Sequence, residues 1–378
     1  MASHEVKILK VIGKEAIENA DNIERLKVLG YHTIVKKSDN YKIGDLVAYI
    51  PEESLIPQWI LEEQGLWDSN RGKGRLAGKN GNRLKIVKLR GAISQGLVLP
   101  VNNNELEIFN PESGMFYSLK VELGQNVKDE LSIKKYEPPI PANLKGEVTY
   151  IGGRLSKFDL ENIKNFPDLI PEGTEVVFTE KLHGTQCNMG ILPGIENNEL
   201  FGEKSEYYVT SKGLGGDRKV VFKNNKVNET NLYVKMIQSN ISKLDMIRNH
   251  YGNSDINITG EVYGKHFDGS GIQNLTYGAE TPKFKIFSVR VDSKVLTYEE
   301  KKEFAAKFGF ELVPLLYKGP FSMKILDEYT KGKSVIPNSD NIREGVVIET
   351  TKPLDNIIIL LKSISEDYLL MNGRTDFN

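Results

Sequence analysis

A lysine at the end of a short apolar run is the residue of this sequence best placed to act as a nucleophile. Lys181 follows Val176-Val177-Phe178, and these β-branched and aromatic residues predict a strand. Gly184, three residues later, predicts a sharp turn. Burial and nearby positive charge both lower the pKa of a lysine, which makes its amine nucleophilic near neutral pH. By itself, the pattern also fits a surface lysine beside a hairpin turn.

Four later segments carry residues that would complete a site around this lysine. They are Gly260–Gly264 with Glu261, Phe284–Val289 with Phe287, Arg343–Ile348 with Glu344, and Lys362 after the apolar run Ile357–Leu361. In order and approximate spacing they resemble the motifs of DNA ligases, RNA ligases and mRNA capping enzymes. The form Glu180-Lys181-Leu182-His183-Gly184-Thr185 is most similar to ATP-dependent RNA ligases. Together with the N-terminal region, the motifs resemble RNA ligase family 5, whose members carry an OB domain ahead of the ligase core.

This resemblance implies a reaction in three steps. The Lys181 amine attacks the α-phosphorus of ATP, pyrophosphate leaves, and a covalent lysine–AMP remains. AMP then passes to a 5′-phosphate end, and a 3′-hydroxyl finally displaces AMP to seal the break. Each step gathers negative charge at phosphorus, so the site needs cations and in-line placement more than acid–base groups.

The resemblance also assigns roles to the residues of the catalytic set, which are Lys181, Lys362, Glu261 and Glu344. Lys362 is expected to neutralise the α-phosphate and to lower the pKa of Lys181. Ligases commonly have two lysines in this motif, two residues apart, but this chain has leucine at 360 and isoleucine at 364. Glu261 is expected to accept hydrogen bonds from ribose hydroxyls or to hold metal-bound water. Glu344 is expected to serve the divalent ion, Mg²⁺ or Mn²⁺, also through water, because these ions prefer oxygen ligands.

Further residues are expected to contact the nucleotide. Phe287 would stack on adenine, with Phe284 as the alternative; His183 would contact phosphate or order its loop. Lys212, in Ser211-Lys212-Gly213, resembles the second ligase motif and would contact phosphate or ribose, although it also fits a mobile loop. Glu180 would lie near the adenine. The whole ATP-binding set is Glu180, Lys181, His183, Gly184, Lys212, Glu261, Phe287, Glu344 and Lys362.

The segment 71–90 holds eight basic residues and no acidic one. Its glycines at 72, 74, 78 and 81 predict a loop. A cationic loop on a small barrel can follow a phosphate backbone, although the same pattern fits a solvated loop. The residues expected to contact nucleic acid are Arg71, Lys73, Arg75, Lys79 and Arg83.

The pattern of strands and helices predicts an α+β protein of two domains. Short strands separated by turn signals predict an OB-fold-like, nucleic-acid-binding β-barrel at residues 1–130. A proline-rich linker is expected at 131–147. Residues 148–378 are then the adenylyltransferase domain, with antiparallel sheets and flanking helices.

Composition narrows the class of protein. The formal net charge of −1 argues against a generally basic surface for nucleic acid, so any such contact must be local. The single cysteine, Cys187, excludes an internal disulfide and fits a reducing compartment. No apolar run is long enough to span a membrane. We therefore expect a soluble, cytoplasmic or otherwise intracellular protein, monomeric, without a membrane partner.

The expected partner is nucleic acid, namely nicked RNA or an RNA-containing duplex with RNA on the 3′-hydroxyl side. One alternative is a DNA ligase or a GTP-using capping enzyme with the same lysine chemistry. Capping enzymes place their OB domain after the core, whereas the barrel predicted here precedes it. A second alternative is an inactive, ligase-like protein that only binds nucleic acid.

Overall fold

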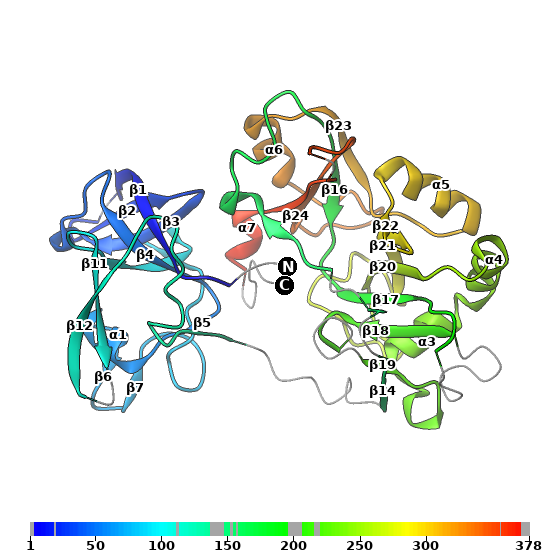
Figure 1. Cartoon of the computed structure of the whole chain (residues 1–378), viewed down its shortest axis with the longest axis horizontal. Coiled ribbons are helices and arrows are strands. Elements are labelled where there is room, and N and C mark those ends of the chain that lie inside the picture. The colour runs from blue at the N-terminus through cyan, green and yellow to red at the C-terminus, as the bar shows by residue number, and fades with distance from the viewer. Residues whose placement is uncertain are drawn as a thin grey trace. The chain divides into compact units, whose positions relative to one another are not determined.

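The computed structural model describes residues 4–18, 20–110, 113–136, 147–151, 154–155, 158–195, 206–214, 220–355 and 357–371. They belong to two compact units, blue to cyan and mainly green to red in Figure 1. The barrel unit comprises the described residues up to 136, residues 162–169 and the described part of the segment from Glu366. The two-sheet unit comprises the described parts of 139–161 and 170–365. Most of the predicted linker, 137–146, lies outside the described residues.

The barrel unit is built on one antiparallel five-stranded sheet in the order β10-β4-β1-β2-β3. These strands are β1 Lys7–Ala16, β2 Ile23–Val28, β3 Tyr31–Lys36, β4 Leu46–Pro51 and β10 Gly96–Pro100. The two edge strands meet, because the Thr33 hydroxyl donates to the Gly96 carbonyl at 2.8 Å and the Gln95 N–H donates to the His32 carbonyl at 2.7 Å. The sheet therefore curls nearly closed, as the predicted barrel requires.

The barrel unit also contains short strands and helices. They are β5 Ser54–Leu55, α1 Gln58–Glu63, β6 Trp67–Asp68, β7 Lys73–Gly74, β8 Val87–Leu89, β9 Ala92–Ser94, β11 Glu105–Asn110, β12 Met115–Lys120, β13 Lys134–Lys135 and, after the last strand of the chain, α7 Glu366–Leu369. The basic segment 71–90 thus runs through β7 and β8 and the loop between them. Residues 163–165 form one 3-10 turn, capped by the Asn162 side chain, where the sequence predicts the start of a helix.

The two-sheet unit contains two antiparallel five-stranded sheets. The first sheet, in the order β15-β25-β24-β16-β23, comprises β15 Glu161–Asn162, β16 Glu175–Lys181, β23 Leu315–Pro320, β24 Gly345–Thr350 and β25 Leu360–Ile364. The second sheet, in the order β18-β17-β20-β21-β22, comprises β17 Thr185–Ile191, β18 Tyr207–Ser211, β20 Ile256–Tyr263, β21 Lys283–Val291 and β22 Lys294–Val295. Separately, β14 Val148–Tyr150 pairs with β19 Val220–Phe222. Only residues 182–184 join β16 to β17, so the chain passes from one sheet to the other directly after Lys181.

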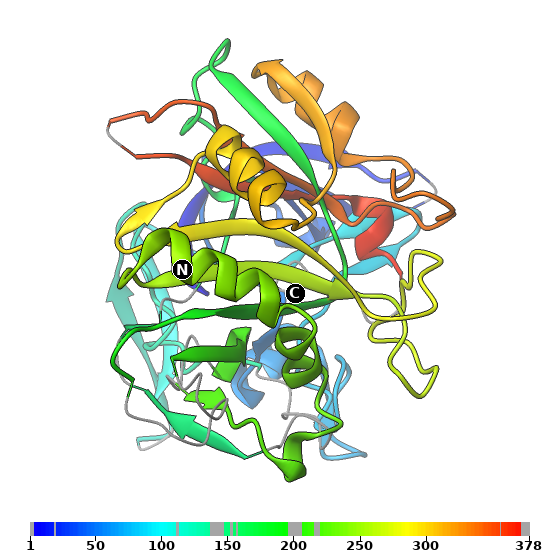
Figure 2. The same ribbon diagram turned by 90° about the vertical axis from the view of Figure 1, so that its right-hand side faces the viewer.

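Helices pack on the second sheet and beside the first (Figure 2). They are α3 Leu232–Gln238, α4 Ile241–Tyr251, α5 Tyr298–Phe308 and α6 Met323–Thr330. α5 has the bounds that its sequence pattern predicts; a capping box between Thr297 and Glu300 begins it, and Gly309, with φ 73°, ends it. The helical pattern over 232–251 is divided at Asn240, whose φ and ψ of −118° and 9° are not helical. The α+β class is confirmed.

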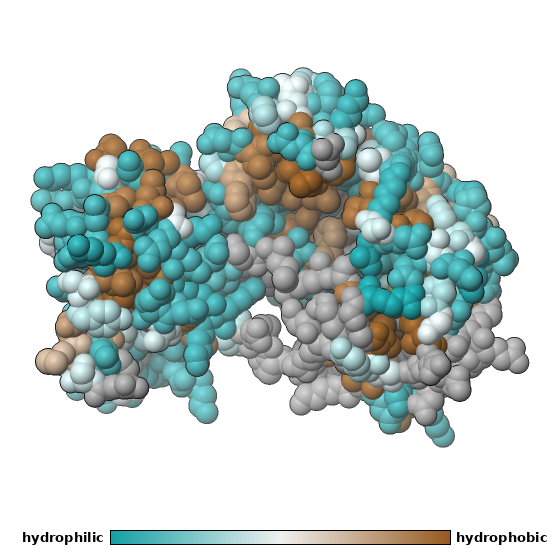
Figure 3. Space-filling model, viewed as in Figure 1, coloured by the Kyte–Doolittle hydropathy of each residue, from teal (hydrophilic) through white to brown (hydrophobic). Residues whose placement is uncertain are grey.

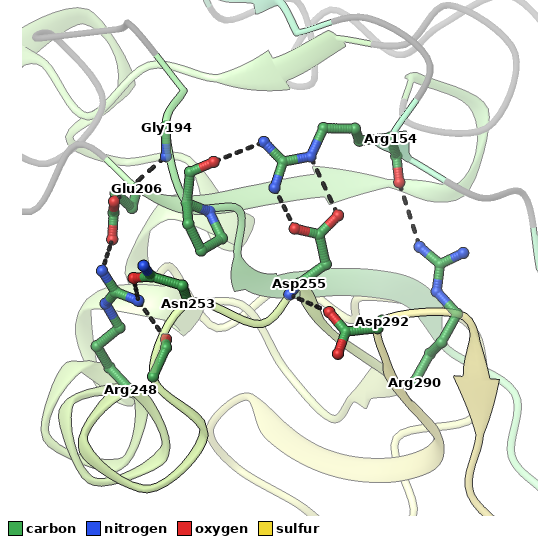
Figure 4. Close-up of polar contacts among 10 residues, drawn as sticks. Arg154, Gly194, Glu206, Arg248, Asn253, Asp255, Arg290 and Asp292 are labelled. Atoms are coloured by element: carbon green, nitrogen blue, oxygen red, sulfur yellow. Dashed lines mark hydrogen bonds and ion pairs between the residues drawn. The ribbon is translucent and has the colours of Figure 1, made fainter.

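An arginine network holds one end of the second sheet, where β20 begins at Ile256 (Figure 4). Arg154 donates from Nε to Asp255 Oδ2 at 3.0 Å and from Nη1 to the Pro193 carbonyl at 2.7 Å. Nearby, Arg248 Nη2 lies 2.8 Å from Glu206 Oε2. The contacts fix the end of the sheet remote from the site described below.

In the part of the chain that the structure describes, no helix is both long and apolar enough to cross a bilayer. Hydrophilic residues cover much of the face shown in Figure 3, with hydrophobic residues in patches between them.

Candidate active site

Lys181 is the last residue of β16, and strand register places it on the same face of the first sheet as Lys362. Lys181 pairs with Gly345, while Thr179 pairs with Val347, which in turn pairs with Lys362. Directly paired residues point to one side of a sheet, and residues two apart on a strand share a face. The two lysines predicted from separate motifs therefore project together.

Lys362 is not at the end of its strand, as the apolar run suggests, but is the central residue of β25. The run misleads because Ile357, 62% exposed, belongs to a turn in which it pairs with Leu354. Lys362 is buried. Its ammonium therefore projects from the middle of a strand and not from a strand end.

The Lys181 ammonium is bound by a glutamate predicted for the site. Its Nζ donates to Glu344 Oε1 at 2.5 Å, and only 1% of the Glu344 side chain is exposed. On the other side of the same carboxylate, His183 Nδ1 lies 3.8 Å from Glu344 Oε2. Glu344 therefore holds the nucleophile and contacts the turn that follows it.

Glu261, on β20 of the second sheet, contacts the same turn. The Gly184 N–H donates to Glu261 Oε1 at 3.0 Å. Position 184 needs glycine because a Cβ there would lie 2.2 Å from the Val262 carbonyl oxygen. The backbone of Gly184 does not have a positive φ, so its role is close approach rather than the conformational freedom expected from the sequence.

The balance of charge in the pocket raises the pKa of Lys181. Burial lowers this pKa, but the carboxylates of Glu344 and Glu261 more than offset burial. The direction is opposite to the one expected from the sequence, because the two glutamates lie closer to the amine than the sequence spacing could reveal. Lys181 is thus held as an ammonium ion.

Burial raises the pKa of Glu261 to about 8. The Lys181 ammonium opposes this rise, and the negative charge of Glu344 adds to it. Burial and the charge of Glu344 therefore both disfavour the ionised form of Glu261, whereas the ammonium of Lys181 favours it.

Lys212 forms an ion pair with Asp159, a residue that the sequence patterns did not indicate. Its Nζ donates to Asp159 Oδ1 at 3.0 Å, and the side chain of Asp159 is only 9% exposed. Lys212 lowers the pKa of Glu261, and Asp159 raises that of Lys181, so both charges act on the site. No motif surrounds Asp159, and its neighbours Lys157 and Glu161 are also charged, so nothing in the local sequence distinguishes it.

Phe287 occupies a β-bulge of β21. On β20, Thr259 pairs with Ser288 and the next residue, Gly260, pairs with Ile286, so Phe287 has no opposite residue. A bulge redirects a side chain, and the Phe287 ring lies against Phe158, with ring centroids 5.0 Å apart. Phe284, the alternative, instead packs against the hydrophobic core, where its ring fills the space beside Gly260.

Glu180 and Tyr277 form hydrogen bonds with the segments around the nucleophile. The sequence patterns did not indicate Tyr277. Glu180 is buried and accepts the Val335 N–H at 2.9 Å. The Tyr277 hydroxyl accepts the His183 N–H at 2.7 Å, and the Tyr277 N–H donates to Asn341 at 3.0 Å. Tyr277 is buried and adopts a φ of 54°, unusual for a bulky residue. Both residues order the loops around Lys181.

In the barrel unit, the five basic residues predicted to contact nucleic acid are not equivalent. Arg71, Lys73, Arg75 and Lys79 lie along the glycine-rich stretch, and all four are exposed. Arg83 instead donates to Glu53 Oε2 at 2.8 Å, and its guanidinium lies 3.6 Å from the centre of the Tyr136 ring. The positive charge of Arg83 is therefore bound by Glu53 and Tyr136 of the same unit.

Comparison with known proteins identifies both regions. A family model described as RNA ligase matches residues 174–363, and an OB-fold domain model matches residues 5–101. No curated protein sequence matches the chain.

Solved structures with the same fold include those of a Naegleria gruberi RNA ligase. A mutant with AMP and Mn has a TM-score of 0.72 at 24% identity, covering 97% of this chain and 98% of that chain. The ligase with PPi has a TM-score of 0.71 at 24% identity and the same coverage. A mutant with ATP and Mn has a TM-score of 0.69 at 24% identity, covering 96% and 97%. Since the RNA ligase model spans 190 of the 378 residues, the chain belongs to the RNA ligase family.

Proposed function

We propose that this RNA ligase uses ATP and forms a covalent AMP intermediate on Lys181. The observation that carries the proposal is the Lys181–Glu344 contact of 2.5 Å, in a pocket that also holds Glu261 and shares a sheet face with Lys362. Structures of the Naegleria ligase with AMP and with ATP support the choice of nucleotide.

The residues of this chain divide the work of the first step. Lys181 is an ammonium and must lose a proton before it attacks; Glu344 Oε1, which accepts its hydrogen bond, is placed to take that proton. The freed amine forms a bond to the α-phosphorus of ATP as the bond to pyrophosphate breaks. Lys362 and Lys212 offer positive charge to the phosphates, and Phe287 offers an aromatic face to adenine.

A divalent metal fits the same pocket. Glu261 and Glu344 supply only oxygen donors, which suits Mg²⁺ or Mn²⁺. Burial disfavours the ionised form of Glu261, and a bound cation would favour it. Among the residues with described structure, no three His, Cys, Asp or Glu side chains are grouped to hold a metal. The two glutamates would therefore share the ion with water and phosphate oxygens. When bound, such an ion supplies positive charge that counters the triphosphate.

The substrate that we propose is a break with 3′-hydroxyl and 5′-phosphate ends, in a duplex with RNA on the 3′-hydroxyl side. The exposed loop Arg71–Lys79 of the barrel unit would contact the phosphate backbone. The enzyme is expected to act as a monomer.

The test is incubation with α-labelled ATP or GTP and a divalent metal, followed by acid precipitation. We expect label from ATP only, and none with Lys181→Ala. Label from GTP would indicate a capping-type reaction, and no label from either nucleotide would contradict the proposal. Matched nicks that differ only in the 3′-terminal sugar then distinguish RNA from DNA sealing.

A further inference from the structure

Lys301, on α5, is a buried lysine outside the catalytic set. It is 4% exposed, and its Nζ lies 2.5 Å from Glu349 Oε2 and 3.1 Å from the carbonyl oxygen of Phe287. Lysine is almost never fully buried unless it is paired. Glu349 is also buried and accepts a further hydrogen bond from the backbone of Tyr298, so the pair and the carbonyl belong to a buried polar cluster.

This cluster joins the two sheets of the unit. Phe287 belongs to β21 in the second sheet, and Glu349 belongs to β24 in the first sheet. α5 lies beside both strands, and this position lets one ammonium reach them (Figure 2). Glu349 is on the strand that directly follows Glu344, the residue that holds the nucleophile.

The bond to Phe287 falls at the bulge. Because Phe287 has no opposite residue on β20, its backbone is displaced from the regular ladder. Its neighbours Ile286 and Ser288 are both buried, while Phe287 is only half-buried beside Phe158. The Lys301 ammonium thus holds the backbone at the one position of β21 whose ring is redirected.

A buried ion pair is weak evidence for a role in stability, because well-packed apolar side chains often stabilise a fold equally well. A directional bond to a bulged carbonyl is something that apolar side chains cannot provide. We propose that Lys301 and Glu349 are positioning residues that hold the bulge and so orient Phe287 toward the adenine base. The proposal rests on the function proposed above.

The test uses the full chain with the double substitution Lys301→Met/Glu349→Leu, which removes both charges together. Inhibition of adenylylation by adenosine reports contacts to the base, and inhibition by tripolyphosphate reports contacts to the phosphates. We expect about tenfold weaker inhibition by adenosine, the scale of one aromatic contact, and inhibition by tripolyphosphate within about twofold of wild type. Sealing of a pre-adenylylated nick, which needs no ATP, should stay within about twofold.

Two controls make the result specific. Glu349→Gln keeps the size of the side chain and removes only its charge, so the test does not depend on the folding of one variant. In a Phe287→Ala background the double substitution should cause no further loss of adenosine inhibition, because residues that act through one another are not additive. Equal losses for adenosine and tripolyphosphate, an undiminished loss in the Phe287→Ala background, or unchanged adenosine inhibition would each overturn the proposal. Failure of the wild-type protein to take label from ATP would instead overturn the proposed function.

Discussion

The two cationic regions of this molecule use positive charge in different ways. In the two-sheet unit, Lys181 and Lys362 are presented from strands of one sheet, and Glu344 holds the Lys181 ammonium at 2.5 Å. In the barrel unit, the loop Arg71–Lys79 carries its cations largely on the surface. Buried charges interact strongly with one partner each, whereas exposed charges are screened and act as a sum.

This difference predicts how each region responds to substitution. Loss of one buried charge should abolish a chemical step, because no neighbour can replace its geometry. Loss of one exposed charge should have a small effect, and several must be removed before binding changes measurably. Arg83 and Lys85 belong to the basic segment in sequence, but Glu53 forms an ion pair with each of them. They therefore share features of the buried and the exposed charges.

After the loss of Lys181 itself, substitution of Glu344 should have the largest effect. Glu344→Gln keeps the shape of the side chain but cannot accept a proton from Lys181 or offer a full charge to a metal. We expect adenylylation to slow by about 10²–10³-fold, measured as single-turnover label transfer from ATP. A variant within about threefold of wild type would show that this contact is not part of the chemistry.

The raised pKa of Glu261 predicts a pH dependence of stability. The folded protein prefers the protonated carboxyl, so this contribution is fully present below the ordinary pKa of glutamate and is lost as the pH rises through about 8. Urea unfolding without nucleotide or metal should show that Glu261→Gln gains about 4 kcal/mol relative to wild type between pH 5 and pH 9. Parallel stability profiles for the two proteins would refute the assignment.

Much of this site could be predicted because its motifs lie on regular elements. The run before Lys181, the strand that carries Glu261 and the helix α5 all have clear periodicity, and the structure contains each of them. Lys362 could be predicted as a site residue, but its position in the middle of the strand could not. Apolar residues of the turn at Ile357 continue the apolar pattern of the strand and hide where the strand begins.

What the sequence could not reveal depends on contacts between distant segments. Asp159 reaches Lys212, and Tyr277 reaches His183, from loops without any repeating pattern. The rise in the pKa of Lys181 has the same origin, since Glu344 is 163 residues away along the chain. The bulge at Phe287 is equally invisible, because only strand pairing defines it.

Removal of the loop charges should have an intermediate effect. The triple substitution Lys73→Ala/Arg75→Ala/Lys79→Ala should weaken binding to a nicked duplex by about tenfold at low salt. If all three residues contact phosphate, the slope of log affinity against log salt should fall by about 2.7, or about 0.9 for each. An unchanged slope would remove this loop from the nucleic-acid surface.

The smallest effect is expected at Lys85, which is a matched control for the loop. Its Nζ lies 2.8 Å from Glu53 Oε1, but Arg83 also pairs with that carboxylate. Lys85→Ala should therefore lower the free energy of unfolding by about 1 kcal/mol and leave the salt dependence of binding unchanged. A fall in the salt slope of about 0.9 would instead place Lys85 among the phosphate contacts.

The central claim is that the amine of Lys181 becomes bonded to AMP. The most direct measurement is mass spectrometry of the protein after incubation with ATP and a divalent metal, with peptide mapping of any adduct. The account predicts one added adenylyl group, located on Lys181 and absent from Lys181→Ala. An adduct on another residue, or an unmodified protein under conditions in which it seals nicks, would contradict it.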